Sequence, residues 1–160
     1  MALDMFLELT DIEGESKDDV YFGQIDVLAW GFGLSQSGTF HRGGGGGAGK
    51  ADFQDLSFTH YYDKASPNLK LRCATGKHIP EAILTVRKAG EAPLEYLKYT
   101  MTKCMITSVS CGGSGGEDQL TESVTINFAE IKEEYTIQKD DGTGEAGPEF
   151  AFNIEANKAT

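Results

Sequence analysis

Apolar residues recur at every second position along much of this 160-residue chain. In segment 2–9, Leu3, Met5, Leu7 and Leu9 fall on one face, and the acidic residues fall on the other. A period of two is typical of β-strands, because successive side chains of a strand point to opposite faces of the sheet. The pattern therefore predicts a chain built mainly of strands.

Segment 25–34, IDVLAWGFGL, is apolar on both of its faces. Strict alternation places its bulkier side chains together on one face, namely Leu28, Trp30, Phe32 and Leu34. Such two-sided apolarity predicts a strand that is covered on both faces. Gly31 and Gly33 fall on the second face, where glycine permits a bend or the close approach of another backbone.

Further strands are predicted at 53–62, 83–90, 94–109, 122–137 and 150–156. In segment 122–137 the apolar residues occupy even positions as far as Phe128 and odd positions from Ile131. A one-residue shift moves every later side chain to the opposite face of a sheet. The sequence therefore predicts a bulge or a sharp bend near Ala129 and Glu130.

One short helix is predicted within segment 63–77, DKASPNLKLRCATGK. Ser66 is expected to cap its start, Pro67 to occupy the first helical position, and Gly76 to close it. Leu69 and Cys73 are four residues apart and are expected to pack one helix face on the sheet. No domain boundary interrupts residues 1–160, so we expect one antiparallel β-barrel or compact two-sheet domain with one short α-helix.

Composition excludes several classes of partner. The chain has 25 acidic and 14 basic residues and a formal net charge of −11. Nucleic acids and anionic membranes are bound through clustered Lys and Arg, so neither is an expected partner. Residues 1–15 lack the basic start of a Sec signal peptide, which predicts synthesis in the cytoplasm and export, if any, by another route.

The glycine-rich segment 43–50, GGGGGAGK, matches the spacing of a phosphate-binding loop from Gly44 to Lys50. Such a loop needs a Ser or Thr after the lysine to bind Mg²⁺, but Ala51 stands there. It should also follow a buried strand and open a helix, whereas polar residues precede it and a predicted strand follows. The segment is therefore interpreted as a surface loop, and no nucleotide cofactor is expected.

No pattern of catalytic or metal-binding residues stands out. The three histidines and three cysteines show no ligand spacing, so neither a metal site nor a disulfide framework is predicted. The letters G-x-S-x-G occur around Ser114, but a predicted strand rather than a helix follows them. A structural or binding role is favoured over an enzyme, although an enzyme built on a β-barrel and a monomeric β-barrel ligand-binding protein remain as alternatives.

Five segments, taken in order, resemble the Hcp family, the tube-forming protein of the bacterial type VI secretion system. They are GESKDD from Gly14, IDVLAWGFGLSQSG from Ile25, HRGGGGGAGKADFQDLSF from His41, DKASPNLKLRCATGKHIPEAILTVRKAG from Asp63, and TSVSCGGSGGEDQLTESVTINFAEI from Thr107. The resemblance runs along essentially the whole chain.

The resemblance implies a barrel of two β-sheets with one helix, assembling as a hexameric ring. It implies that rings stack into a tube, which a contractile sheath drives outward beneath a VgrG spike. It also implies that the lumen carries small effector proteins and that the tube is secreted without a signal peptide. The resemblance implies neither a cofactor nor a catalytic residue.

The resemblance also suggests which residues make contacts. In the family, the corresponding loop reaches a neighbouring subunit. The candidates for subunit or ring contact are therefore Gly43, Gly44, Gly45, Gly46, Gly47, Ala48, Gly49 and Lys50. Trp30, Gly31 and Phe32 are candidates for contact with effectors in the lumen. A core position is favoured for Trp30 and Phe32, so Gly31 is the preferred candidate. Cys104 and Cys111 receive no role.

Overall fold

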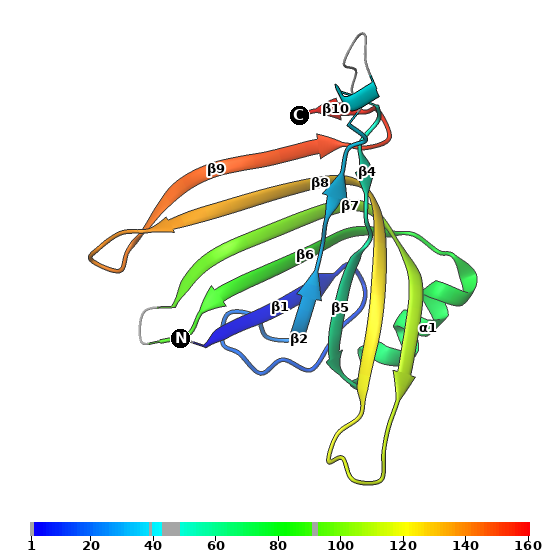
Figure 1. Cartoon of the computed structure of the whole chain (residues 1–160). Coiled ribbons are helices and arrows are strands. Elements are labelled where there is room, and N and C mark those ends of the chain that lie inside the picture. The colour runs from blue at the N-terminus through cyan, green and yellow to red at the C-terminus, as the bar shows by residue number, and fades with distance from the viewer. Residues whose placement is uncertain (1, 39, 43–48, 91–92) are drawn as a thin grey trace.

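The computed structural model describes residues 2–38, 40–42, 49–90 and 93–160 (Figure 1). The long strands are β1 (Leu3–Leu9), β2 (Ile25–Gly31), β5 (Leu56–Tyr61), β6 (Ile79–Lys88), β7 (Leu94–Gly112), β8 (Thr121–Gln138) and β9 (Gly144–Asn153). The short elements are β3 (Leu34–Ser35), a 3₁₀ turn (Phe40–Arg42), β4 (Asp52–Phe53), helix α1 (Ala65–Thr75) and β10 (Lys158–Ala159).

Six antiparallel strands close into a barrel. The main sheet runs in the order β10-β9-β8-β5-β2-β1-β6-β7, and β7 pairs back onto β8. The closed ring of strands is therefore β8, β5, β2, β1, β6 and β7, while β9 and β10 extend the sheet beyond the barrel (Figure 1). This confirms the prediction of a mainly β fold with one short helix.

Strand β8 belongs to two parts of the sheet. Its first half, residues 121–126, pairs with β5, and its second half, residues 130–138, pairs with β9. Both Phe128 and Ile131 are buried, so the strand changes its buried face between these two residues. The bend predicted near Ala129 and Glu130 is confirmed, and Figure 1 shows β8 curving there.

The same change of face occurs on the neighbouring strand. On β7, Met101 and Cys104 are both buried, and they pair with Ile131 and Phe128. Lys103 lies between them with a φ of 54°, a left-handed conformation that is uncommon for a residue with a side chain. Because β7 and β8 turn at the same place, their pairing register continues across the bend without a shift.

The face assignment predicted for β2 is wrong beyond Val27. Val27 pairs with His60 while Ala29 pairs with Thr59, so Leu28 is the extra residue of a bulge. A bulge reverses the alternation that follows it, because one residue is left out of the pairing. Trp30 consequently lies on the same face as Val27, and Leu28 is exposed.

The start of α1 also differs from the prediction. The helix begins at Ala65, one residue before the predicted cap. The Asp63 carboxylate accepts a hydrogen bond from the Ala65 N–H (2.9 Å), and the Ser66 hydroxyl accepts one from the Asp63 N–H (3.2 Å). Ser66 is therefore the reciprocal member of a capping box, and Pro67 lies inside the first turn.

The end of α1 follows the prediction. Gly76 has a φ of 69° and donates its N–H to the Arg72 carbonyl (2.9 Å), which closes the helix. Leu69 is fully buried, and Cys73 packs against the core beside it. Within the residues that the structure describes, no helix is long and apolar enough to cross a membrane.

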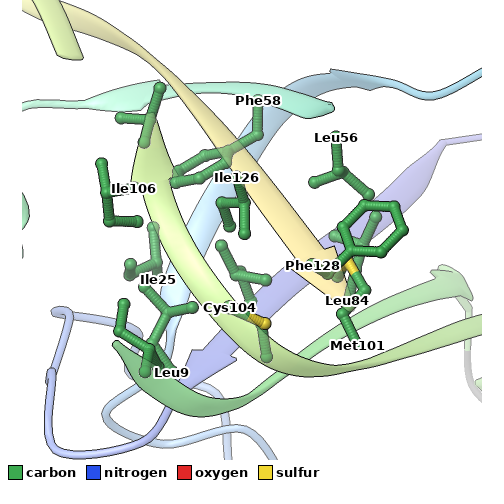
Figure 2. Packing of buried hydrophobic residues seen from close by; sticks show 14 of the residues in the cluster. Leu9, Ile25, Leu56, Phe58, Leu84, Met101, Cys104, Ile106, Ile126 and Phe128 are labelled. Carbon is green, nitrogen blue, oxygen red and sulfur yellow. The ribbon is translucent and has the colours of Figure 1, made fainter. Parts of the chain in front are cut away.

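Side chains fill the interior of the barrel (Figure 2). Phe58 and Ile126 come from β5 and β8, Leu84 comes from β6, and Met101 and Cys104 come from β7. Burial raises the pKa of the Cys104 thiol to about 12, so this sulfur stays protonated and unreactive at neutral pH. The barrel is thus a packed core rather than a container.

Residues 10–24 form a loop that is fastened to the outside of the barrel. Arg87 on β6 binds the Asp18 carboxylate through both terminal nitrogens (2.7 and 3.1 Å) and lies over the Tyr21 ring. The hydrogen bond from Arg87 lowers the pKa of Asp18 to about 2. Within the loop, the Gly14 N–H donates to the Gly23 carbonyl at 2.8 Å.

Candidate functional site

Small uncharged side chains cover the outside of the barrel where β2, β5, β8 and β7 lie side by side. Side chains that point inward from β5 and β8 are buried, as Phe58 and Val124 show. The residues that precede them on the same strands, Ser57 and Ser123, point outward. Paired residues form two rows across the four strands: Gly31, Ser57, Thr125 and Ser108, and Ala29, Thr59, Ser123 and Ser110. We call these two rows the hydroxyl face.

Hydroxyl groups of this face contact one another across the strands. The Thr125 hydroxyl lies 2.6 Å from that of Ser108, and the Thr59 hydroxyl lies 3.4 Å from that of Ser123. The Ser57 hydroxyl donates to the Gly31 carbonyl at 3.4 Å. Each hydroxyl can both donate and accept, so the face can form hydrogen bonds with either kind of group on a partner.

The hydroxyl face is electrically neutral in a chain where 24% of residues are charged and the net charge is −11. Neither row contains an ionisable side chain. Asp55 lies at the margin, where its carboxylate accepts hydrogen bonds from Thr107 (2.6 Å) and Asn127 (2.9 Å). The face can therefore contact a partner without strongly attracting or repelling positively or negatively charged groups on that partner.

Gly31 lies on the hydroxyl face, whereas its two neighbours pack toward the core. The Trp30 ring meets Tyr99 edge-on at 5.3 Å between ring centroids, and Phe32 lies 5.8 Å from both Tyr99 and Phe128. A Cβ atom added at Gly31 would lie 3.3 Å from the Ser57 hydroxyl, a side chain that can rotate away. Of the three lumen candidates, Gly31 alone presents its backbone on this outer face.

The predicted contact loop lies mostly outside the described residues. Of its eight residues, Gly43 to Ala48 are not described, while Gly49 and Lys50 are exposed. Among the residues that are described, no group of three or more His, Cys, Asp or Glu side chains is arranged to hold a metal ion. A surface groove of about 580 Å³ lies between the 10–24 loop and the barrel, lined in part by Glu8, Glu13 and Phe22.

Residues 6–135 match the family described as "Type VI secretion system effector, Hcp". The chain belongs to the Hcp family. Over 159 residues it is 55% identical to "Protein hcp1" of Pseudomonas aeruginosa, with 98% of each chain covered. Its fold matches Hcp1 of Salmonella typhimurium with a TM-score of 0.80 and 38% identity over all of both chains. It also matches "a type six secretion system protein" with a TM-score of 0.94 and 26% identity over 99% of this chain and 100% of the other.

Membership of the Hcp family makes this chain a tube protein of the type VI secretion system. The hydroxyl face was not predicted from the sequence as a site. Its signal was nevertheless present, because LSFTHY and ESVTINF place Ser or Thr at the outward positions between buried apolar residues. Pairing of distant strands then brings Ser57 and Thr125 together with Gly31, which no local pattern reveals.

Proposed function

We propose that this Hcp chain is a non-enzymatic structural subunit whose hexameric rings stack into the secretion tube. The match to the Hcp family over residues 6–135, together with 55% identity to a relative along 98% of the chain, carries the proposal. Native mass spectrometry tests it, because a six-chain species supports the ring. A species of one chain at every protein concentration would instead favour a monomeric ligand-binding barrel.

The packed interior weakens that alternative. A ligand-binding barrel holds its ligand inside, but here Leu56, Phe58 and Ile126 fill the barrel with their side chains. The second alternative, an enzyme built on the same barrel, predicts that turnover is lost when a single His or acidic residue is replaced. Neither alternative needs a neutral outer face such as the hydroxyl face.

The proposed partners follow from a tube that is ejected by a contractile machine. They are further copies of this chain, small effector proteins in the lumen, the sheath around the tube and the VgrG spike at its end. The chain would be made in the cytoplasm and secreted through the type VI apparatus to the extracellular space or the target cell. The net charge of −11 supports the view that neither nucleic acid nor membrane is a partner.

We further propose that the hydroxyl face lines the lumen and contacts effectors. A wall that holds different proteins and later releases them needs hydrogen-bonding groups without strong charges. The two rows around Gly31 provide hydroxyl groups and no ionisable side chain. Trp30 and Phe32 contribute to this role by holding the Gly31 strand against the core.

The loop at residues 43–50 is proposed to contact a neighbouring subunit or ring. Gly49 and Lys50 are exposed, and glycine allows two backbones to approach closely. Unchanged hexamers and unchanged tube growth after deletion of Gly43 to Gly47 would count against this contact.

Replacing Gly31 with arginine is expected to abolish retention of effectors while the ring still forms. The new side chain places a long cation on the neutral hydroxyl face, and the nearby Ser57 hydroxyl can move aside. Co-expression with small effector proteins followed by affinity purification measures retention, and native mass spectrometry measures the ring. Ala74→Arg is the matched control, because Ala74 is exposed on α1. Effector retained by Gly31→Arg as by the control would contradict the assignment of the face.

A further inference from the structure

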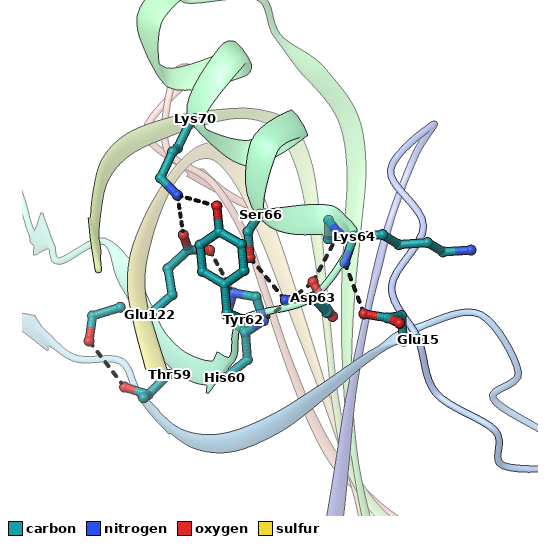
Figure 3. A network of polar contacts seen from close by, with 11 residues as sticks. Glu15, Thr59, His60, Tyr62, Asp63, Lys64, Ser66, Lys70 and Glu122 are labelled. Carbon is teal, nitrogen blue, oxygen red and sulfur yellow. Dashed lines mark hydrogen bonds and ion pairs between the residues drawn. The ribbon is translucent and has the colours of Figure 1, made fainter. Parts of the chain in front are cut away.

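A buried pair of ionisable side chains joins two strands of the barrel beneath α1 (Figure 3). His60 on β5 and Glu122 on β8 are directly paired residues, and the His60 Nε2 lies 2.8 Å from the Glu122 Oε1. Both side chains are 0% exposed. Placing two such groups in the interior is costly unless their charges and hydrogen bonds are matched, so their partners decide what the pair does.

The partners come from α1 and from the segment that leads into it. The Lys70 ammonium group on α1 lies 3.2 Å from the Glu122 Oε2 and 3.0 Å from the Tyr62 hydroxyl. Asp63, whose carboxylate caps the helix, lies 3.7 Å from the His60 Nδ1, an ion-pair distance rather than a hydrogen bond. Asp63 at the start of α1 and Lys70 in its middle therefore connect the helix to His60 on β5 and Glu122 on β8.

Two further titratable groups face this cluster. Asp26 on β2 lies near Asp63, and Cys111 on β7, the strand partner of Glu122, lies near Lys70. Neither forms a hydrogen bond or ion pair with the imidazole. The charge that His60 experiences most directly thus comes from the carboxylates of Asp63 and Glu122.

The protonation state of His60 decides whether these charges balance. With the imidazole protonated, two cations face two carboxylates, whereas the neutral imidazole leaves one negative charge uncompensated. Burial opposes protonation and lowers the pKa of His60, but the carboxylates of Asp63 and Glu122 outweigh burial and raise it above its ordinary value of 6.5. The protonated form thus persists to higher pH in the folded protein than in an exposed histidine.

We propose that the cluster of His60, Glu122, Lys70 and Asp63 is a proton-sensitive latch that holds α1 on the barrel. A group whose pKa is raised by folding stabilises fully below its unfolded pKa, and this contribution is lost as the pH rises through its folded pKa. The latch is therefore fully closed below about pH 6.5, the ordinary pKa of histidine, and loosens as the pH rises through the higher pKa of folded His60. All contacts of the latch lie within one chain, so it does not depend on the ring, the tube or the effectors.

Hydrogen exchange of the purified full-length protein between about pH 6 and 8.5 tests the latch. Exchange at the Cε1–H of each histidine, read by mass spectrometry, gives the pKa of His60 separately from those of His41 and His78. Amide exchange of residues 69–76, corrected for its intrinsic pH dependence, gives the protection of α1. We expect protection to be constant below about pH 6.5 and then to fall by up to about tenfold per pH unit until the pKa of His60 is passed. Amides of β1 and β6 serve as the internal reference and should not follow this curve.

His60→Gln removes the titrating group, and His78→Gln is the matched control because His78 is exposed. The pH dependence of α1 protection should vanish in the first variant and persist in the second. Protection of α1 that is independent of pH in the unmodified protein overturns the proposal, as does a His60 pKa at or below 6.5. These two readouts need no variant, so they decide the question even if His60→Gln fails to fold.

Discussion

Phe58→Ala is expected to lower the free energy of unfolding by about 3–5 kcal/mol, because it removes a large side chain from the centre of the core. Phe58 is 2% exposed and lies among residues from several strands of the barrel. Alanine would leave a cavity that the surrounding strands, joined in a closed ring, have little freedom to fill. Urea denaturation measures the loss, at one fixed protein concentration because assembly contributes to apparent stability.

Phe22→Ala is the matched control for this substitution. Phe22 is 77% exposed in the 10–24 loop, so the same truncation should change stability by no more than about 0.5 kcal/mol. Similar losses for the two variants would mean that the barrel interior is not the main source of stability.

Gly14→Ala is expected to cost about 1–3 kcal/mol and to detach the 10–24 loop from the barrel. A Cβ atom at this position would lie 2.6 Å from the Gln24 carbonyl oxygen and 2.7 Å from the Ile25 Cα. Both are backbone atoms and cannot rotate away, so the loop must move and its Gly14–Gly23 hydrogen bond must lengthen or break. Urea denaturation measures the cost, and faster amide exchange at residues 14–24 reports the detachment.

Gly112→Ala is the control for Gly14→Ala, because an added methyl group has room at Gly112. Apart from Gly112 itself and its two chain neighbours, no described residue has an atom within 4 Å of a Cβ atom built at Gly112, which ends β7. Its stability should be unchanged, or raised by up to about 1 kcal/mol, because alanine loses less conformational freedom than glycine. A Gly14→Ala variant as stable as Gly112→Ala would show that the loop adapts without cost.

Local patterns predicted the features that depend on local chemistry. The alternation of apolar residues predicted the strands. The switch of apolar residues from even to odd positions between Phe128 and Ile131 predicted the bend in β8, because apolar side chains face the core on both sides of it. Gly76 was correctly predicted to end α1, because few other residues adopt its left-handed conformation at low cost.

Features that depend on pairing between distant strands could not be predicted in this way. The bulge at Leu28 exists because β2 must keep register with β5, and it reverses the faces of Trp30 and Gly31 relative to strict alternation. The buried contact of His60 with Glu122 joins residues 62 positions apart. His60 looked isolated in the sequence because Glu122 lies on another strand.

Electron microscopy of the purified protein in negative stain tests the central claim most directly. If this chain forms hexameric rings that stack into a secretion tube, the images will show uniform rings with an open centre. Compact particles without a central hole, persisting at high protein concentration, would contradict the claim.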